Sequence, residues 1–552
     1  MTEPLSASPF APSQAGDDLL ALFYEPAIER VSYGWEPRLV TRVPSLRHGE
    51  VMTRVVTVDT GMRYADALGF VRQHETGSSM QLPQLVVTFT LRQDLRWSDG
   101  TPITAKDAVL GYHLAQAPEA QGRWRALVKR TAQFTALDEW TLRWVGIPGY
   151  LSADYPSFLF PLQPAHRWHD QTLPTILADH TPPATGPFKI VAWEAHREAR
   201  LVRNEHYAGP QPQLEEIVVR FPQYAPESWN ALLIDGTCDV ILPDPVLGTS
   251  WQQWSVLSAR GEATIWADPA PTVLRLDLNL DPVRHGAGGT VEKIPSPLRD
   301  VQVREALNSC VARLSLTYAL PAEAILPAAG FIPPNHPAGK EAEPSGYNPQ
   351  AAGRLLDAVG WRDLNGDGLR VAEDVPGFTN GEPLSLTLHF ASQYFVIAAH
   401  LAADLDACGI GVDLRAVDAQ QFYTPGIPSP LFGRHFDMAL LGWQAELPNV
   451  CGAWLSDRIP DETNGWNGEN FSGFAAEAYD VACREALLAL DPESQSVALN
   501  KALGLLKSAH PTLFLAWRPF WFVTRPEIKG LRPDVSAYGT LWNAEALSIG
   551  DD

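Results

Sequence analysis

Segment 363–374 places oxygen ligands at the spacing of an EF-hand-like calcium loop. Positions 1, 3, 5, 7 and 12 of such a loop are Asp363, Asn365, Asp367, Leu369 and Asp374, with Leu369 offering its backbone carbonyl. Gly368 at position 6 permits the sharp turn that the loop requires. The usual bidentate Glu of position 12 is replaced by Asp374, and Glu373 stands one place early. The pattern offers a calcium site at this loop, while a solvated turn is the favoured interpretation.

No catalytic motif accompanies this loop. The sequence has no nucleophile elbow, P-loop, HExxH motif or GxGxxG motif between a strand and a helix. His166 and His169 are three residues apart and precede Asp170, but no third ligand is evident and Pro164 favours a surface turn. We therefore expect a protein that is not an enzyme.

The cysteines Cys238, Cys310, Cys408, Cys451 and Cys483 show no CxxC or Cys/His metal spacing. Their odd number leaves at least one thiol free. Buried, unreactive cysteines are the favoured interpretation. A Cys451–Cys483 bridge in an oxidising compartment and a catalytic thiol are the alternatives.

The composition is that of a large folded protein. Of its 552 residues, 45% are hydrophobic and 19% charged, so the chain can bury a large core and is not globally disordered. No apolar run of about 18 residues occurs, so no hydrophobic membrane-spanning helix is predicted. The net charge of −22 and the lack of a basic block argue against nucleic acid and anionic membranes as partners. The 18 tryptophans predict large flat surfaces that are buried or bind a ligand.

Short β-rich runs alternate with amphipathic helical stretches, which predicts a mixed α/β architecture. A variant capping box, Thr104 with Asp107, opens one helix. Further helices are predicted over 301–316, 351–359, 396–408 and 475–508, with glycines at 360 and 409 ending the second and third. Strands are predicted over 86–91, 188–193, 199–202, 216–221, 411–414 and 512–523.

Four segments in a fixed order point to one family. They are 88–107 with Trp97-Ser98-Asp99-Gly100, 184–207 with Gly186-Pro187-Phe188, 297–313 with Asp300-Val301-Gln302-Val303-Arg304, and 470–480 with Asn470-Phe471-Ser472-Gly473. In order and spacing they resemble the family 5 extracytoplasmic solute-binding proteins, the peptide- and nickel-type receptors of ABC importers. Most of these residues suit structural roles, such as the tight turn at Gly186-Pro187 and the helix cap at Asp300. They identify the fold without naming the ligand.

The resemblance implies an α/β fold of the periplasmic-binding-protein type II class. Two lobes would be joined by hinge strands and would close on a ligand, and one lobe would carry an additional peripheral subdomain. We expect hinges near Ala270-Pro271 and over 514–517. The expected limits are 1–40, 175–270 and 518–552 for the core of lobe I, 41–174 for the peripheral subdomain, and 271–517 for lobe II.

The resemblance also suggests ligand contacts. Peptide-binding relatives carry an acid that pairs with the α-ammonium of the peptide, and Glu446 is the aligned residue here. A carboxylate in a closed cleft is costly unless it is paired, so an amine-bearing ligand would supply its partner. The alternative is that Glu446 pairs with a nearby Arg or faces water.

Other segments that line the cleft in relatives contain aromatic side chains and one amide: Trp443, Trp454, Trp466, Phe471, Trp517 and Asn470. Trp35 is a further candidate from the other lobe. Such walls can hold peptide side chains or stack on sugars. The alternative is that most of these residues belong to the core, and that Asn470 only holds a turn.

The favoured function is a non-enzymatic receptor that captures an oligopeptide or similar amine-bearing solute and delivers it to membrane permease subunits. An oligosaccharide receptor of the same fold is the first alternative, and a secreted hydrolase with paired carboxylates is less favoured. We expect a monomer at an extracytoplasmic location, periplasmic or lipid-anchored. The chain lacks the export signal and first strand with which relatives begin, which favours a shortened form of an exported protein.

Overall fold

The computed structural model describes residues 3–4, 8–66, 69–75, 77–221, 228–242, 251–286, 290–319, 326–330, 332–336, 346–444 and 450–550. The chain divides into two compact units. Unit 1 comprises Met1–Asp268, Leu488–Asp491 and Phe520–Asp552, and unit 2 comprises Pro269–Leu487 and Pro492–Pro519.

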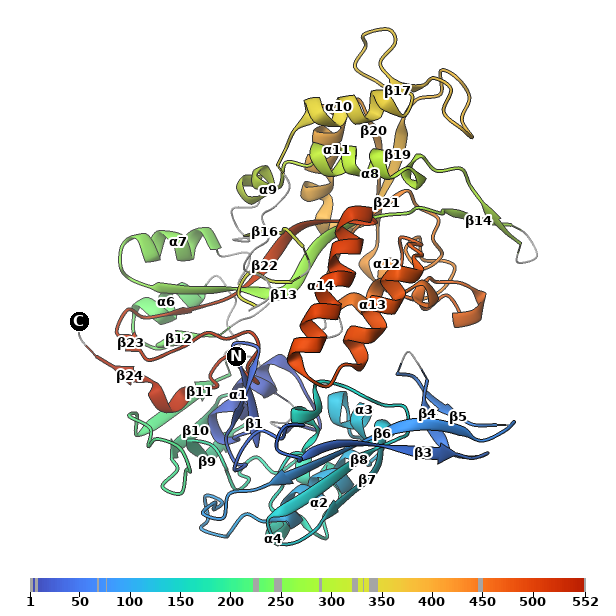
Figure 1. Ribbon diagram of the computed structural model, residues 1–552. Helices are drawn as coiled ribbons and strands as arrows, with labels where there is room; N and C mark the ends of the chain where they lie inside the picture. The colour runs from blue at the N-terminus through green and yellow to red at the C-terminus, as the bar shows by residue number, and fades with distance from the viewer. Residues whose placement is uncertain are drawn as a thin grey trace. The chain divides into compact units, whose positions relative to one another are not determined.

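Two long strands carry the chain from one unit to the other (Figure 1). They are β13 (Thr264–Leu278) and β22 (Thr512–Thr524). The residues that the sequence analysis proposed as hinges, 270–271 and 514–517, lie within these strands. Movement about them, and the expected limits of the lobes and the subdomain, stay predictions.

Unit 1 contains an antiparallel sheet with the strand order β3-β6-β8-β7. Its strands are β3 (Val51–Val58), β6 (Met80–Thr90), β8 (Thr141–Gly146) and β7 (Thr131–Ala136). Helices α2 (Ala105–Ala115) and α3 (Gly122–Arg130) share its core with the buried side chains of Trp97, Trp144 and Phe160. As predicted, α2 follows Thr104, whose backbone N–H donates to the Asp107 carboxylate at 2.7 Å. This bond satisfies one donor at the helix start.

A second sheet of unit 1, in the order β11-β10-β9, confirms the predicted hairpin and third strand. Its strands are β9 (Phe188–Glu194), β10 (Glu198–Arg203) and β11 (Glu216–Arg220), and α1 (Gln14–Phe23) shares their core. The other elements of unit 1 are β1 (Ile28–Val31), β2 (Gly34–Pro37), β4 (Arg63–Ala65), β5 (Val71–Gln73), α4 (Ala165–Trp168), α5 (Leu173–Leu177), α6 (Trp229–Ile234), β12 (Val240–Ile241), α7 (Trp251–Ala259), β23 (Ile528–Lys529) and β24 (Ser548–Ile549).

Unit 2 is built on a mixed sheet. β13 pairs antiparallel with β21 (Met438–Gln444), and β19 (Ser385–Ala391) pairs parallel with both β21 and β20 (Gly411–Val417). Helices α8 (Val301–Cys310), α10 (Pro349–Ala358) and α11 (Phe395–Asp406) share its core. The predicted helices over 351–359 and 396–408 are confirmed, and Gly360 and Gly409 after them have φ of +90° and +81°. Such angles favour glycine and stop a helix.

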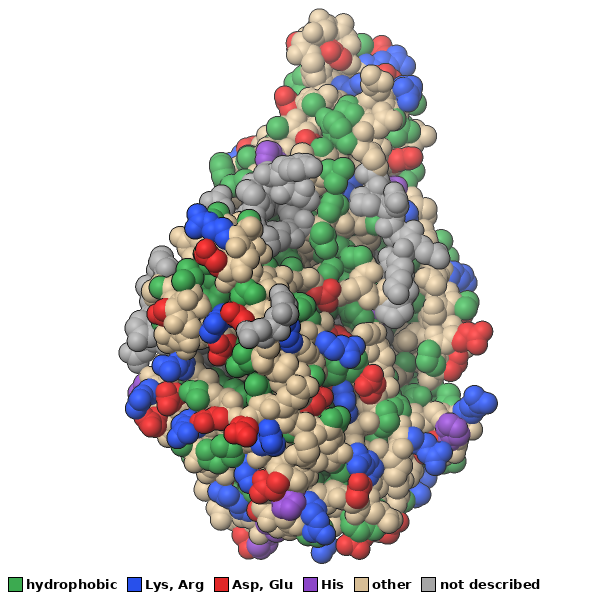
Figure 2. Space-filling model, turned by 90° about the vertical axis from the view of Figure 1, so that its left-hand side faces the viewer, with side chains coloured by type: hydrophobic (Ala, Val, Ile, Leu, Met, Phe, Trp, Pro, Cys, Tyr) green, Lys and Arg blue, Asp and Glu red, His purple; other side chains and the backbone are tan. Residues whose placement is uncertain are grey.

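The other elements of unit 2 are β14 (Val283–His285), β15 (Val291–Lys293), α9 (Arg313–Ala319), β16 (Leu326–Pro327), β17 (Trp361–Arg362), β18 (Val371–Ala372), α12 (Ala419–Tyr423), α13 (Glu477–Leu488) and α14 (Pro492–Ala509). On the face that Figure 2 shows, acidic and basic side chains lie interspersed.

Two of the predicted helices are each broken into two. The stretch predicted over 301–316 breaks at Val311, which is extended, and the next N–H, of Ala312, donates to the Asp404 carboxylate at 2.9 Å. The stretch predicted over 475–508 ends at Leu488 and resumes at Pro492. Proline has no N–H and clashes with the preceding turn, so it occupies the start of a new helix.

Four of the five cysteines form disulfides, Cys310–Cys408 and Cys451–Cys483. The favoured expectation of unbridged cysteines was therefore wrong for these four, and the alternative Cys451–Cys483 pairing is confirmed. Cys238 is a half-buried free thiol.

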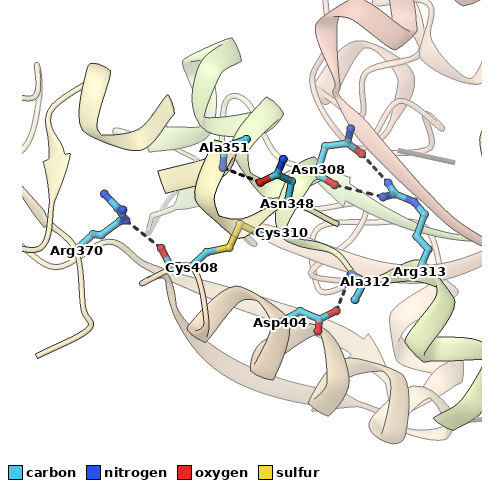
Figure 3. The surroundings of a disulfide bond; sticks show 9 residues. All are labelled: Asn308, Cys310, Ala312, Arg313, Asn348, Ala351, Arg370, Asp404 and Cys408. Atoms are coloured by element: carbon cyan, nitrogen blue, oxygen red, sulfur yellow. Dashed lines mark hydrogen bonds between the residues drawn. A yellow bond between two sulfur atoms is a disulfide. The ribbon is translucent and has the colours of Figure 1, made fainter. Parts of the chain in front are cut away.

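The Cys310–Cys408 bridge joins the end of α8 to a residue just after α11 (Figure 3). Polar contacts surround it. Asp404 accepts from the N–H of Ala312 at 2.9 Å, and the Arg370 Nε donates to the Cys408 carbonyl at 3.0 Å. The bridge thus lies where a helix end and two loops are already tied together.

Candidate functional site

The predicted anchor Glu446 follows β21, and it lies outside the described residues. Its role stays a prediction. The last described residue of this strand is Gln444, and Trp443 before it pairs with Val273 of β13.

Three of the predicted aromatic contacts meet around a side chain that the sequence analysis did not single out, Arg275. Its Cζ lies 5.2 Å from the ring centroid of Trp443, 4.8 Å from that of Trp454 and 6.0 Å from that of Phe471. Phe471 and Trp454 are buried, and Trp443 is half-buried. A positively charged guanidinium is attracted by the partial negative charge on the faces of aromatic rings. These aromatics therefore enclose a cation of the protein itself.

The charge of Arg275 is balanced within the same strand. Its Nη2 lies 3.0 Å from Oδ2 of Asp277, and the Thr512 hydroxyl donates to Oδ1 at 2.7 Å. Both charged side chains are almost fully buried, at 1% and 0% exposure. Burial raises the pKa of the Asp277 carboxyl, and the Arg275 guanidinium opposes that rise. The pair is a fully desolvated ion pair beneath Trp443.

A sequence signal for this pair did exist. Arg275 and Asp277 alternate with Leu274, Leu276 and Leu278 along β13. Two opposite charges at alternate positions share one face of a strand, so the sequence places them where they can pair with each other.

Three other predicted ligand-contacting side chains make contacts within unit 2 itself. The buried Asn470 donates from Nδ2 to the carbonyls of Trp454 and Phe474, at 3.0 and 2.7 Å, so its amide holds a turn. Trp517 packs with Val273 in a small buried cluster. The Trp466 ring packs edge-on against His285 with centroids 4.7 Å apart.

Loop 363–374 joins β17 to β18, which pair as a hairpin. Three predicted calcium ligands accept backbone N–H groups of the loop itself: Asp363, Asn365 and Asp367. The backbone N–H of Asp374 instead donates to Oδ1 of Asn380 at 2.8 Å, and Nδ2 of Asn380 donates to the Asp374 carboxylate at 3.3 Å. The backbone N–H of Leu369 donates to Asp367. In the described part of the chain, no three His, Cys, Asp or Glu side chains gather closely enough to hold a metal. Calcium binding stays a prediction.

Trp35, the candidate from the other lobe, lines a pocket of about 310 Å³ whose walls belong entirely to unit 1. Its aromatic walls are Tyr24, Trp35, Trp124, Phe160 and Tyr538. Its charged lining is Asp17, Glu29, Arg30, Arg123 and Asp154. Only Trp35 was predicted. The others come from α1 and the residue after it, the β1–β2 hairpin, α3, the segment 154–161 and the C-terminal segment, and no local pattern links these parts of the chain.

The two arginines of this pocket are held by neighbours in unit 1. Arg30 lies over Trp35 at 5.1 Å and approaches Asp154 at 3.9 Å. Arg123 lies over Trp124 at 4.2 Å and donates to the Ser157 carbonyl at 3.1 Å. Both guanidiniums are thereby oriented along the walls.

The other two carboxylates of the pocket, those of Glu29 and Asp17, form no ion pair with any described residue. Glu29 is 4% exposed, and its Oε1 accepts the backbone N–H groups of Arg30 at 3.1 Å and Tyr538 at 3.0 Å. Burial raises the pKa of Glu29 to about 7, and burial together with the neighbouring Asp18 raises that of Asp17 to about 6. Both carboxyl groups therefore have pKa values close to neutral pH.

No helix among the described residues is long and apolar enough to cross a membrane.

Comparison with known sequences finds relatives of low identity. A Brucella ovis protein provisionally named an ABC transporter peptide-binding protein is 25% identical over 350 residues, which cover 61% of this chain and 59% of that protein. The nickel-binding periplasmic protein of Escherichia coli is 24% identical over 353 residues, or 61% of each chain. The chain thus matches less than two thirds of the length of these relatives.

Solved structures share the fold over nearly the whole chain. NikA from Brucella suis in complex with Fe(III)-EDTA has a TM-score of 0.68 at 20% identity, covering 100% of this chain and 98% of that one. An ABC transporter substrate-binding protein from Sinorhizobium meliloti has a TM-score of 0.71 at 17% identity, covering 97% and 95%. The expected fold, a periplasmic-binding-protein type II α/β fold, is confirmed.

A family model for the middle part of the bacterial extracellular solute-binding proteins, family 5, matches residues 78–456, more than half of the chain. Members of this family bind solutes and are not enzymes, in agreement with the expectation from the sequence. The four signature segments, the fold and this match lead to one conclusion: the chain belongs to family 5 of the bacterial extracellular solute-binding proteins.

Proposed function

We propose that this protein is the extracytoplasmic substrate-binding component of an ABC importer, and that it captures an amine-bearing solute, with an oligopeptide as the favoured class. Closure about β13 and β22 would enclose the solute, and a monomer would deliver it to permease subunits in the membrane. The names of the relatives support this assignment, since one is provisionally called peptide-binding and another is a nickel-binding periplasmic protein.

The observation that carries the proposal is the pocket of unit 1. Its volume of about 310 Å³ is in the range of small-molecule sites. It combines aromatic walls with carboxylates and guanidiniums. This set suits a charged organic group better than a neutral sugar ring or a bare metal ion.

A thermal-shift screen tests the assignment. Short peptides, cello- and manno-oligosaccharides and nickel salts would be titrated against the pure protein. A ligand that binds only the folded state at 100 times its Kd adds about 2.7 kcal/mol of stability, which gives a clear rise in Tm. Stabilisation by oligosaccharides alone would replace the peptide assignment with the oligosaccharide receptor.

Glu446 gives the second test of this function. Glu446→Gln is expected to weaken peptide binding about 30-fold or more, because the ammonium of the ligand would be left buried without a charged partner. Isothermal titration calorimetry of the best peptide from the screen measures this change. Glu462→Gln, at an exposed carboxylate of unit 2, is the control and should bind like the parent. Equal affinity of Glu446→Gln and the parent would remove Glu446 from the site.

We also propose calcium at loop 363–374. Calcium would be bound by oxygens at roughly 2.3–2.6 Å, and its removal should lower the Tm of the protein. Melting curves with EDTA and with added calcium measure the effect, and Asp363→Ala together with Asp367→Ala should abolish it. Curves that coincide under both conditions would reduce the loop to a turn.

A further inference from the structure

We propose that the pocket of unit 1 is a subsite for a cationic group of the solute, an amine or a guanidinium, with the carboxylates of Glu29 and Asp17 as its charge partners. This inference rests on the proposed function and deepens it, because it names the charge of the group that enters unit 1.

The first support is the position of the Glu29 carboxylate. Glu29 lines the pocket and is more than nine-tenths buried. Both of its hydrogen bonds, from the N–H groups of Arg30 and Tyr538, end on Oε1. Within the described ranges, Oε2 receives no hydrogen bond and no cation forms an ion pair with this side chain. A buried carboxylate without a cation is costly, and a ligand cation would offset that cost.

The second support is Asp17, on α1. It lines the same pocket, is half-buried, and its carboxylate makes no ion pair or side-chain hydrogen bond with any part of the chain that the structure describes. The phenol of Tyr538 lies within electrostatic range of both Asp17 and Glu29. Tyr538 and the two carboxylates therefore line one pocket, and carboxylates beside an aromatic ring suit amines and guanidiniums.

The charges already present leave room for a cation. Of the three pocket carboxylates, Asp154 faces Arg30, which itself lies over Trp35. Arg123 lies over Trp124. With all groups ionised, three carboxylates and two guanidiniums give the pocket a net charge of −1.

The pKa of Glu29 is consistent with a cationic subsite. Burial raises it to about 7, while Arg38 opposes the rise and Asp534 adds to it. Tyr538 and Glu25 also lie within electrostatic range of the Glu29 carboxylate, and the pocket is further lined by the titratable or charged side chains of Asp17, Tyr24, Arg30, Arg123 and Asp154. A cation that enters would favour the ionised form, so binding should release a proton near pH 6.5. Affinity should therefore rise with pH as Glu29 ionises.

The test compares triarginine with tricitrulline, a neutral analogue of nearly the same shape, and with triglutamate. Calorimetry at low ionic strength is expected to show that triarginine binds at least about 10-fold more tightly than tricitrulline, and that triglutamate binds weakest. Glu29→Gln should remove most of this preference while its side-chain oxygen still accepts the two N–H groups. Asp17→Asn should reduce the preference less, because Asp17 is less buried.

Glu36→Gln is the matched control. Glu36 is the cross-strand partner of Glu29 in the β1–β2 hairpin, but it is exposed and lies outside the pocket. It should keep the preference of the parent. Calorimetric titration of triarginine in two buffers of different ionisation enthalpy measures the number of protons released on binding. The parent should release more protons than Glu29→Gln. If Glu29 had only a structural role, the two proteins would release equal numbers.

The outcomes separate this inference from the proposed function. Peptides that bind without a preference for cations, or with a preference that both pocket variants retain, would overturn the cationic subsite and leave the peptide receptor standing. Failure of all three peptides to bind would overturn the peptide assignment. The pocket would then be judged with agmatine: saturable binding that Glu29→Gln removes would support the subsite, and no binding would overturn it.

Discussion

Replacing Arg275 with methionine is expected to lower the free energy of unfolding of unit 2 by about 3–5 kcal/mol. The change leaves Asp277 as an uncompensated charge in a site with 0% exposure, and it removes the cation from between Trp443, Trp454 and Phe471. Urea unfolding followed by circular dichroism and tryptophan fluorescence measures the loss.

Strand β20, at the end of the same sheet, provides a matched control. Arg415 pairs with Asp413 at the same two-residue spacing, but both side chains are exposed. Arg415→Met should therefore cost at most about 1 kcal/mol. The double variant Arg275→Met with Asp277→Asn should recover much of the loss, because the unpaired charge is gone. Similar costs for Arg275→Met and Arg415→Met would show that the buried pair is not what stabilises this part of unit 2.

Removal of the Cys310–Cys408 bridge is the second large effect. The bridge spans 98 residues, and closing a loop of that length constrains the unfolded chain by about 4.7 kcal/mol in the loop-entropy account. Cys310→Ala with Cys408→Ala is expected to lower the stability of unit 2 by roughly 2–5 kcal/mol. The Tm in the presence and absence of a thiol reductant measures it.

The other cysteines supply the comparison. The Cys451–Cys483 bridge spans 32 residues, so its removal should cost less, up to about 3.7 kcal/mol in the same account. Cys238→Ala, at the half-buried free thiol, should change little. Mass spectrometry of the alkylated protein should find one reactive thiol before reduction and five after it. Five reactive thiols in the oxidised protein would contradict both bridges.

Several elements could be predicted because their causes are local. The start of α2 at Thr104 follows from a side chain three residues away, and the helix ends before Gly360 and Gly409 follow from the backbone freedom of glycine. The break before Pro492 was also local and was overlooked. The family signatures identified the fold for the same reason, since they record turns and caps.

The sequence alone therefore determined the family, the fold class and most helices and strands of this protein. The tertiary structure decided which segments distant in the sequence contact one another. It broke the helix at Val311 because Asp404, far along the chain, binds the next N–H. It bridged Cys310 to Cys408, and it placed Arg275 among aromatics from segments more than 160 residues away. It also brought α1, the β1–β2 hairpin and Tyr538 around one pocket. These contacts form only when the whole chain packs. Burial excludes water, so a buried charge must find a partner, and that partner comes from a distant segment that no local pattern specifies.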